Sequence, residues 1–451
     1  MKITFLGATG TVTGSKYLVS TENYKIMVDC GLFQGLKQLR LKNWKPLPID
    51  PASVDAVVLT HAHIDHTGYL PLLVKNGFQG KVYCSVATRD LCEILLPDSA
   101  FLQEEEARYA NKRGYSKHNP ALPLYTQEDA ERALKLLEPV RFGEEIEVAD
   151  RVKIRLMPAG HILGAALVYL SAEGKTILFS GDLGRMNDPL MLPPSIVREA
   201  DYLVLESTYG NRLHEEGEPE AKLASIINRT YARGGILVVP VFAVGRAQEL
   251  LYHIQKLKDE RRIPDIPVYL NSPMAVDATE IFVNHCDLHK LSPEQCKMVA
   301  NSARMVNSVE ESQSLNTINH PVIILSASGM ASGGRVVHHI KAFGPDPRNT
   351  ILFAGYQAAG TRGAAMLDGA ESVKIHGEYV PINAEVAQIS NLSAHADYNE
   401  IMEWLNHFER PPTMTFIVHG EPVAADAMRH RIEENLRWEV TVPDYLETVE
   451  L

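Results

Sequence analysis

Cysteine is scarce in this chain of 451 residues. The cysteines are odd in number and form no Cys-x-x-Cys pair; they are Cys30, Cys84, Cys92, Cys286 and Cys296. This usage argues against a disulfide framework and suits a reducing compartment. The sequence therefore predicts free thiols and a cytoplasmic protein.

Long apolar runs are also missing. No stretch of about 18 consecutive apolar residues occurs, so we expect no membrane span and no membrane partner. Residues 1–7 have a short strand pattern and lack the apolar length of a signal peptide. Both observations again favour the cytoplasm as the location of the protein.

Positive charge is in deficit, because 44 Lys and Arg residues stand against 56 Asp and Glu residues and give a formal net charge of −12. This balance argues against broad, nonspecific binding of polyanions. It does not argue against a phosphodiester held at a metal site, where bound cations supply positive charge locally. The chain is longer than one ordinary hydrophobic core requires, so we expect two domains.

The chain does contain a dense group of potential metal ligands in the stretch Thr-His-Ala-His-Ile-Asp-His at residues 60–66. The apolar run 56–59 before it predicts a buried strand. Side chains alternate along an extended chain, so His61 and His63 point the same way. Asp65 and His66 follow the strand and can turn toward a second point. Imidazole and carboxylate groups without thiolates favour zinc in an open catalytic site.

Chemically capable residues also follow other apolar runs in this chain. Strand ends are where ligands gather in layered α/β folds, because a rigid scaffold positions the side chains and loops expose them. The repetition of the pattern predicts one shared site. The residues that follow these other runs are Asp29, His161, Asp182, Glu206 and His419.

The middle of the chain has a different sequence pattern. Apolar runs at 235–240, 322–325 and 350–353 alternate with helical patterns. This alternation predicts βαβ units and a parallel sheet. We therefore expect an α/β protein in which residues 208–391 form a domain inserted into a first domain made of residues 1–207 and 392–451.

The spacing His-x-His-x-Asp-His at 61–66, followed by His161 and Asp182, resembles the signature of the metallo-β-lactamase fold. Three further motifs resemble those of the β-CASP nucleases, which include the cleavage subunit of the pre-mRNA 3′-end machinery and bacterial RNase J. They are Glu206 in Glu-Ser-Thr-Tyr-Gly, His395 in Ser-Ala-His-Ala-Asp and His419 in Val-His-Gly. The segments 243–251, 326–330 and 355–363 are also similar to this family, so the resemblance covers nearly the whole chain.

The resemblance implies a metallo-β-lactamase αββα sandwich with an inserted α/β (β-CASP) domain and two bound Zn²⁺ ions. His61, His63 and His161 would bind one zinc. Asp65, His66 and His419 would bind the other zinc, and Asp182 would bridge both. Asp29 resembles a family residue that orients a ligand from behind, and such partners fix the tautomer of an imidazole.

The resemblance also implies a zinc-dependent ribonuclease that cleaves single-stranded RNA in a cleft between the two domains, by attack of a metal-bound hydroxide. The expected catalytic residues are Asp65, Glu206 and His395. His395 would give a proton to the leaving 3′-oxygen, and Glu206 would keep the imidazole charged and oriented. Endonuclease and 5′-3′ exonuclease action share these motifs, so both stay open.

Candidate RNA contacts lie in the inserted domain. Ser328 and Gly329 belong to a segment of small residues between an apolar run and a helical pattern, where backbone N–H groups can approach a phosphate. Arg246, Arg335 and Arg362 are in loops from which they could contact the RNA backbone. The alternative for each arginine is a salt bridge on the protein surface, and the alternative for the small-residue segment is a plain glycine-rich turn.

Two other functions stay open. The first is hydrolysis of a small ester or thioester by a metallo-β-lactamase-fold enzyme, against which the long inserted domain, Glu206 and His395 argue. The second is a non-catalytic partner in RNA processing, against which the complete ligand set argues. The sequence does not decide between a monomer and a homodimer, or between RNA and single-stranded DNA.

Overall fold

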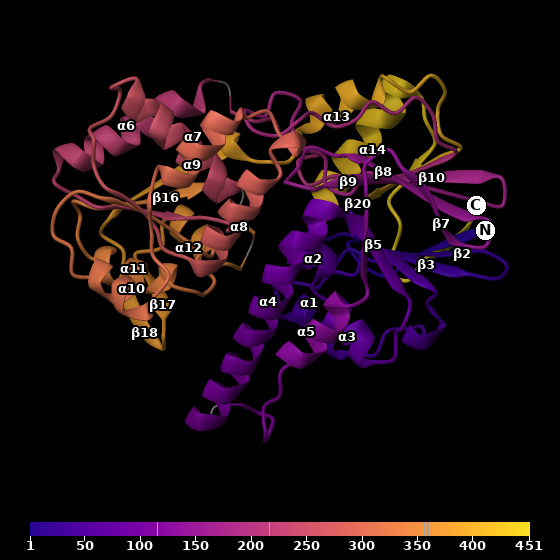
Figure 1. Cartoon of the computed structure of the whole chain (residues 1–451), viewed down its shortest axis with the longest axis horizontal. Coiled ribbons are helices and arrows are strands. Elements are labelled where there is room, and N and C mark those ends of the chain that lie inside the picture. Colours follow the sequence, from indigo (N-terminus) through magenta and orange to yellow (C-terminus); the bar gives the residue numbers. More distant parts are fainter. Residues whose placement is uncertain (115, 216, 356, 359) are drawn as a thin grey trace. The chain divides into compact units, whose positions relative to one another are not determined.

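The computed structural model describes every residue except Tyr115, Glu216, Tyr356 and Ala359, and it does not describe the side chain of Asn391. The chain forms two compact units (Figure 1). Unit 1 comprises Met1–Leu213 and His395–Leu451, and unit 2 comprises His214–Ala394. The domain boundaries expected from the sequence were 207/208 and 391/392. Tyr356 and Ala359 belong to the segment 355–363, so that part of the family resemblance lies outside the described residues.

In the part of the chain that the structure describes, unit 1 is built on two seven-stranded sheets. The first has the order β22-β1-β2-β3-β4-β5-β6 and the second β21-β20-β11-β10-β9-β8-β7. The first sheet consists of β1 (Lys2–Phe5), β2 (Tyr17–Ser20), β3 (Lys25–Val28), β4 (Ala56–Val58), β5 (Lys81–Ser85), β6 (Leu137–Val140) and β22 (Thr448–Glu450). The second consists of β7 (Glu145–Ala149), β8 (Val152–Pro158), β9 (Ala166–Ala172), β10 (Lys175–Phe179), β11 (Tyr202–Glu206), β20 (Met414–Val418) and β21 (Val440–Thr441).

The two sheets pack face to face through one hydrophobic core. Alternation along β8 shows why: Val152, Ile154 and Leu156 are buried, while the residues between them are more exposed. The same core contains Phe5 of the first sheet and Phe179 of the second. Burial of each such side chain contributes about 1.5–3 kcal/mol relative to exposure, so the alternating pattern sets which face of each strand points inward.

Helices cover the outer faces of this sandwich. On the first sheet, α4 packs against β5 and β6, and on the second, α14 packs against β20 and β21 (Figure 1). Four αββα layers result, as the resemblance to the metallo-β-lactamase fold implied. The helices of unit 1 are α1 (Lys37–Arg40), α2 (Ile64–Thr67), α3 (Leu70–Lys75), α4 (Val86–Arg113), α5 (Gln127–Leu134), α13 (Tyr398–Leu405) and α14 (Pro422–Leu436).

The long helix α4 has clear start and stop signals. The hydroxyl of Ser85 accepts a hydrogen bond from the backbone N–H of Thr88, and Gly114 ends the helix with a positive φ of 65°. Among the described residues, neither α4 nor any other helix has the length and apolar character needed to cross a bilayer. Each of the five cysteines lies in the described part of the chain and is a free thiol.

Unit 2 has, among its described residues, a six-stranded sheet of order β14-β13-β15-β12-β16-β19, in which the paired strands run parallel. The parallel sheet agrees with the alternation seen in the sequence. Its strands are β12 (Leu237–Pro240), β13 (Val268–Leu270), β14 (Arg304–Met305), β15 (Ile323–Ser326), β16 (Thr350–Ala354) and β19 (Glu385–Ile389), and a hairpin adds β17 (Ser372–Ile375) and β18 (Glu378–Pro381). The helices are α6 (Pro219–Ala232), α7 (Arg246–Asp259), α8 (Pro273–Asn284), α9 (Pro293–Asn301), α10 (Val309–Leu315), α11 (Val336–Phe343) and α12 (Arg362–Leu367).

Strand direction in unit 1 explains where polar side chains gather. In the first sheet, β3 runs parallel to β4. In the second, β11 runs parallel to both β10 and β20. Parallel strands end at the same edge of a sheet, and residues just beyond those ends are displayed together. The residues that follow these strands include Asp29, His61, Asp182, Glu206 (the last residue of β11) and His419.

The surroundings of Gly31 show how closely the loops approach one another at this edge of the sheet. A Cβ at position 31 would lie 1.6 Å from the carbonyl oxygen of Asp65 and 2.7 Å from the backbone nitrogen of His66. We expect Gly31→Ala to lower the free energy of unfolding by about 1–3 kcal/mol, because the added methyl must push these two loops apart. Urea unfolding measures the change. Gly333→Ala is the control, since its Cβ meets nothing within 4 Å; equal losses in the two variants would contradict this packing.

Candidate metal centre and active site

Four side chains form a first group of potential metal ligands. His63 Nδ1 lies 3.0 Å from His61 Nε2 and 3.3 Å from His161 Nε2. Asp182 Oδ2 lies 3.4 Å from His61 Nε2 and 3.5 Å from His161 Nε2. Ligands bound to one tetrahedral zinc at 2.0–2.1 Å lie about 3.3 Å from each other. The observed spacings therefore fit a single ion held among these four atoms.

A second group lies beside the first. His66 Nε2 is 3.1 Å from His419 Nε2, which is 3.4 Å from Asp65 Oδ2. The other oxygen of Asp182, Oδ1, is 3.3 Å from His66 Nε2. These separations also suit one tetrahedral ion. Asp182 is 2% exposed and directs one carboxylate oxygen to each group, so it has the geometry of a bridging ligand.

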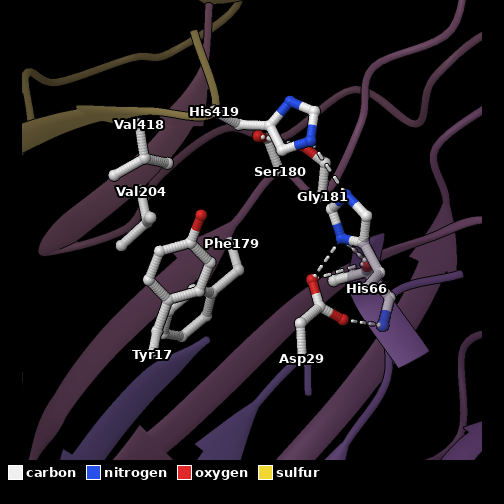
Figure 2. A pocket seen from close by; sticks show the side chains of 10 residues that line it. Tyr17, Asp29, His66, Phe179, Ser180, Gly181, Val204, Val418 and His419 are labelled. Atoms are coloured by element: carbon white, nitrogen blue, oxygen red, sulfur yellow. Dashed lines mark hydrogen bonds and ion pairs between the residues drawn. The ribbon is translucent and has the colours of Figure 1, made fainter. Parts of the chain in front are cut away.

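Asp29 orients His66 from behind, as Figure 2 shows. His66 Nδ1–H donates to Asp29 Oδ2 at 2.7 Å, and the carboxylate also accepts from the backbone N–H and the hydroxyl of Thr60. With the proton on Nδ1, Nε2 is the nitrogen that points into the second group. Asp29 has a positive φ of 58°, a conformation that costs free energy and that clusters at functional sites.

Thr208 contacts Nδ1 of His419 and orients that imidazole, as Asp29 orients His66. Its hydroxyl donates to the carbonyl of His419 at 3.2 Å, and the same oxygen lies 3.0 Å from His419 Nδ1. Because the hydroxyl proton is used on the carbonyl, the oxygen accepts from Nδ1–H, and Nε2 points at Asp65 and His66. His419 also has a positive φ, of 48°, and its N–H donates to the carbonyl of Ala8.

Burial and neighbouring charge set the protonation of these groups. Burial lowers the pKa of His63 to about 4, and it holds the pKa of His61 well below its ordinary value. Both rings are therefore neutral, as metal ligands must be. Burial alone would raise the pKa of Asp182, but the surrounding histidines outweigh it and keep that pKa well below the usual range.

His66 behaves differently from the other imidazoles. Burial alone would lower its pKa, but the carboxylates of Asp182 and Asp29 outweigh burial and raise the pKa well above the ordinary value. A proton thus partly balances the two carboxylates. A bound cation would replace that proton, which is the usual coupling between metal binding and proton release.

A histidine–carboxylate pair adjoins the ligand groups. His395 Nδ1–H donates to Glu206 Oε1 at 3.1 Å, and Glu206 is fully buried. Glu206 also accepts from the backbone N–H groups of Leu183 and Thr208, which fix the carboxylate. Burial alone would lower the pKa of His395, but Glu206, together with Asp182 and Asp65, outweighs burial and raises it to about 9. The ring centroid of His395 lies 4.4 Å from that of His161, so a protonated imidazole stands at the edge of the metal centre.

Comparison with known proteins assigns the family. Models of three families match the chain: the metallo-β-lactamase superfamily over residues 9–208, the Beta-Casp domain over 247–366, and a Zn-dependent metallo-hydrolase RNA specificity domain over 379–443. A ribonuclease of Thermus thermophilus is 36% identical over 429 residues, which cover 93% of each chain. The chain belongs to the β-CASP family of the metallo-β-lactamase superfamily. Membership of this family makes it a metal-dependent hydrolase.

Other relatives of this β-CASP hydrolase span most of its length. An RNase J-like protein of Methanocaldococcus jannaschii is 30% identical over 94% of each chain. A transcription termination factor, FttA, of Methanosarcina mazei is 32% identical, and the match covers all of this chain and 72% of the factor. A solved structure of a protein of unknown function from Enterococcus faecalis has a TM-score of 0.57 at 14% identity, over 100% of this chain and 99% of that one, and shows the fold alone.

The arginines predicted to contact RNA are engaged within unit 2 of the β-CASP hydrolase. Arg246 is 7% exposed and forms an ion pair with Glu249. The guanidinium of Arg335 donates to the carbonyls of Val306 and Asn307 and to the side chain of Asn271. Arg246 is the first residue of α7 rather than a loop residue, and its ion pair lies within that helix. The contacts of Arg335 fix the segment that follows β14. Contact of Arg246 or Arg335 with RNA stays a prediction.

The small-residue segment after β15 is held in a similar way. Arg362 donates to the carbonyls of Lys374, Ala331 and Ser332. The hydroxyl of Ser328 accepts from the backbone N–H of Ser332. A Cβ on Gly329 would lie 2.6 Å from the ring of Phe242, which explains why glycine stands there. The prediction that Ser328, Gly329 and Arg362 contact RNA is not tested by these contacts.

Sequence reasoning missed Thr208. The motif that contains Glu206 also contains this threonine, but a hydroxyl two residues beyond a strand gives no sign of the imidazole that it contacts, 211 positions away in the chain. A signal was available in part, because Thr208 lies only two residues beyond the end of β11. Nothing in the sequence indicated that the hydroxyl of Thr60 donates a hydrogen bond to Asp29, 31 positions away in the chain.

Thr208→Val tests the orientation of His419 in this β-CASP hydrolase. The variant keeps the side-chain shape and the backbone N–H to Glu206 but loses the hydroxyl that accepts from His419 Nδ1–H. We expect the affinity of the group that contains His419 for a metal ion to fall 10- to 100-fold, because outer partners of metal-binding imidazoles contribute that much. Calorimetric titration of zinc into metal-stripped protein measures both sites. Thr208→Ser, which keeps the hydroxyl, should bind like the wild type; equal affinities in all three proteins would contradict the assignment.

Proposed function

We propose that this β-CASP hydrolase is a zinc-dependent ribonuclease acting on single-stranded RNA. The observation that carries the proposal is the pair of ligand groups sharing Asp182, with the Glu206–His395 pair beside them. Relatives that span nearly the whole chain are named a ribonuclease and an RNase J-like protein, which supports RNA as the substrate. Cleavage inside the chain, from the 5′ end, or both, is compatible with this site.

The two ligand groups would each hold one zinc ion, and Asp182 would contribute to both. The first ion would take His61, His63 and His161, and the second Asp65, His66 and His419. Bound there, two zinc ions would acidify a shared water and neutralise charge that develops on the phosphate oxygens. The protein contributes neutral imidazoles, ionised carboxylates and partners that fix their tautomers.

His395 is the group best suited to protonate the leaving 3′-oxygen. Glu206 holds its Nδ1–H, so the proton that can be transferred is the one on Nε2. A raised pKa keeps that proton in place near neutral pH, and Glu206 stabilises the imidazolium until transfer. The products would be a 5′-phosphate and a 3′-hydroxyl. A small ester would not need this buried acid pair, which favours a phosphodiester over the ester alternative.

Incubation with RNA tests the reaction. We expect the zinc-loaded protein to shorten a single-stranded RNA, to stop when a chelator is added, and to recover when zinc is returned, because the ligand groups need their ions. RNA labelled at the 5′ end and RNA labelled internally separate internal cuts from stepwise removal of 5′ nucleotides. Asp182→Asn should abolish cleavage. Activity on a chromogenic ester with none on RNA would contradict the proposal.

His395→Ala tests the acid. We expect kcat on RNA to fall about 10²- to 10⁴-fold, the usual contribution of a positioned proton donor, with zinc content unchanged. An aryl phosphodiester with a nitrophenolate leaving group needs no proton on departure, so its hydrolysis should fall far less. Equal losses on both substrates would show that His395 does something other than protonate the leaving oxygen.

A further inference from the structure

An open cavity of about 660 Å³ lies in unit 1 and is used by none of the steps above. Its volume is within the range of small-ligand sites, about 300–1,000 Å³. Its walls come from the loop after β1, the first turns of α14, β21 and the segment that follows β21. The lining residues are Thr9, Gly10, Pro422, Asp426, Arg429, Val440, Thr441, Val442, Pro443, Asp444 and Tyr445.

The cavity lies at the catalytic edge of the second sheet. Strand β21 runs parallel to β20, with Thr415 opposite Val440 and Phe416 opposite Thr441. Parallel neighbours end at the same edge, so β20 leads into His419 at the edge where β21 leads into the cavity wall. The wall formed by Thr9 also lies near His419. The carbonyl of Ala8, which precedes Thr9, accepts a hydrogen bond from the backbone N–H of His419 at 2.7 Å. Thr9 of the cavity wall is therefore next in the chain to a residue that contacts the predicted metal ligand His419.

The chemistry of the walls suits a base better than a phosphate. Arg429, a cation among the lining residues, is already paired with Asp426 and Glu433. Arg429 also lowers the pKa of Asp426 through a hydrogen bond, so this carboxylate is ionised and accepts hydrogen bonds. The carboxylates of Asp426 and Asp444 repel a phosphate but attract N–H groups. Tyr445, 39% exposed, offers an aromatic ring, the usual platform for an unpaired base. The ammonium of Lys42 lies 4.0 Å from the centroid of this ring and covers one face, so the other face is the one a base would contact.

We propose that this cavity binds the base of one nucleotide flanking the cleaved phosphodiester and selects guanine. This inference rests on the proposed ribonuclease function. Guanine presents two adjacent donors, N1–H and the 2-amino group, which one carboxylate can accept together. Uracil presents a single N–H between two carbonyl oxygens, and the carboxylates repel those oxygens. Asp426, held in place by Arg429, accepts the guanine edge, and Tyr445 lies against the ring. The match of residues 379–443 to an RNA specificity domain agrees with this placement.

Base-resolved cleavage tests the cavity. A set of RNAs, identical except for the base on either side of one cleaved bond, is incubated with wild type, Asp426→Asn and Tyr445→Leu. We expect the wild type to prefer guanine at one position by about 10-fold in kcat/KM, within the range for a paired base contact. Asp426→Asn should lose this preference mainly through a higher KM on the guanine RNA. Glu434→Gln, an exposed carboxylate on the same helix outside the cavity, is the control and should behave as wild type.

A binding measurement separates this inference from the ribonuclease proposal. Asp182→Asn, which should not cleave, is titrated with a fluorescent oligonucleotide that contains guanine and with one in which uracil replaces the guanine. The same two titrations are repeated with the double variant Asp182→Asn/Asp426→Asn. Tighter binding of the guanine oligonucleotide that disappears with Asp426→Asn supports the cavity even if the wild type fails to cut RNA. Cleavage by the wild type with the same base profile in Asp426→Asn and Tyr445→Leu overturns the cavity assignment and leaves the ribonuclease proposal intact.

Discussion

The carboxylate of Asp182 is the point on which this structure depends. It is buried among four imidazoles, those of His61, His66, His161 and His419. A buried charge is costly unless opposite charge is close; burial keeps the ring of His61 neutral, and the proton that His66 holds is shared between Asp182 and Asp29. Two cations, one on each carboxylate oxygen, would satisfy Asp182 and the neutral rings together. The strand ends that carry these side chains are arranged around that requirement.

Two sheets meet this requirement by ending parallel strands at shared edges. His66 and His419 are 353 positions apart in the chain, yet their Nε2 atoms lie 3.1 Å apart. Rigid strands hold such distances better than loops do. Asp29 and His419 both have a positive φ, so the backbone is held in a costly conformation just beyond the ends of β3 and β20. Packing of the sandwich core stabilises this arrangement.

Much of the fold could be predicted from the sequence, because the strands of both units carry strong patterns of burial and end in recognisable residues. The order of polar strand ends also predicted which side chains would meet: His161, Asp182 and His419 lie with the 61–66 stretch. What could not be predicted depends on tertiary contacts. The hydroxyl of Thr208, the carbonyl partners of Arg335 and the cavity beside α14 arise from residues far apart in the chain, and no local pattern reports such contacts.

The most direct test is diffraction from crystals of the zinc-loaded protein, collected on both sides of the zinc absorption edge. Two anomalous peaks should appear about 3.5–4 Å apart, as in paired-metal hydrolases. One peak should lie among His61, His63 and His161, the other among Asp65, His66 and His419, with an oxygen of Asp182 bonded to each. A single peak, or peaks away from Asp182, would contradict the shared-carboxylate centre.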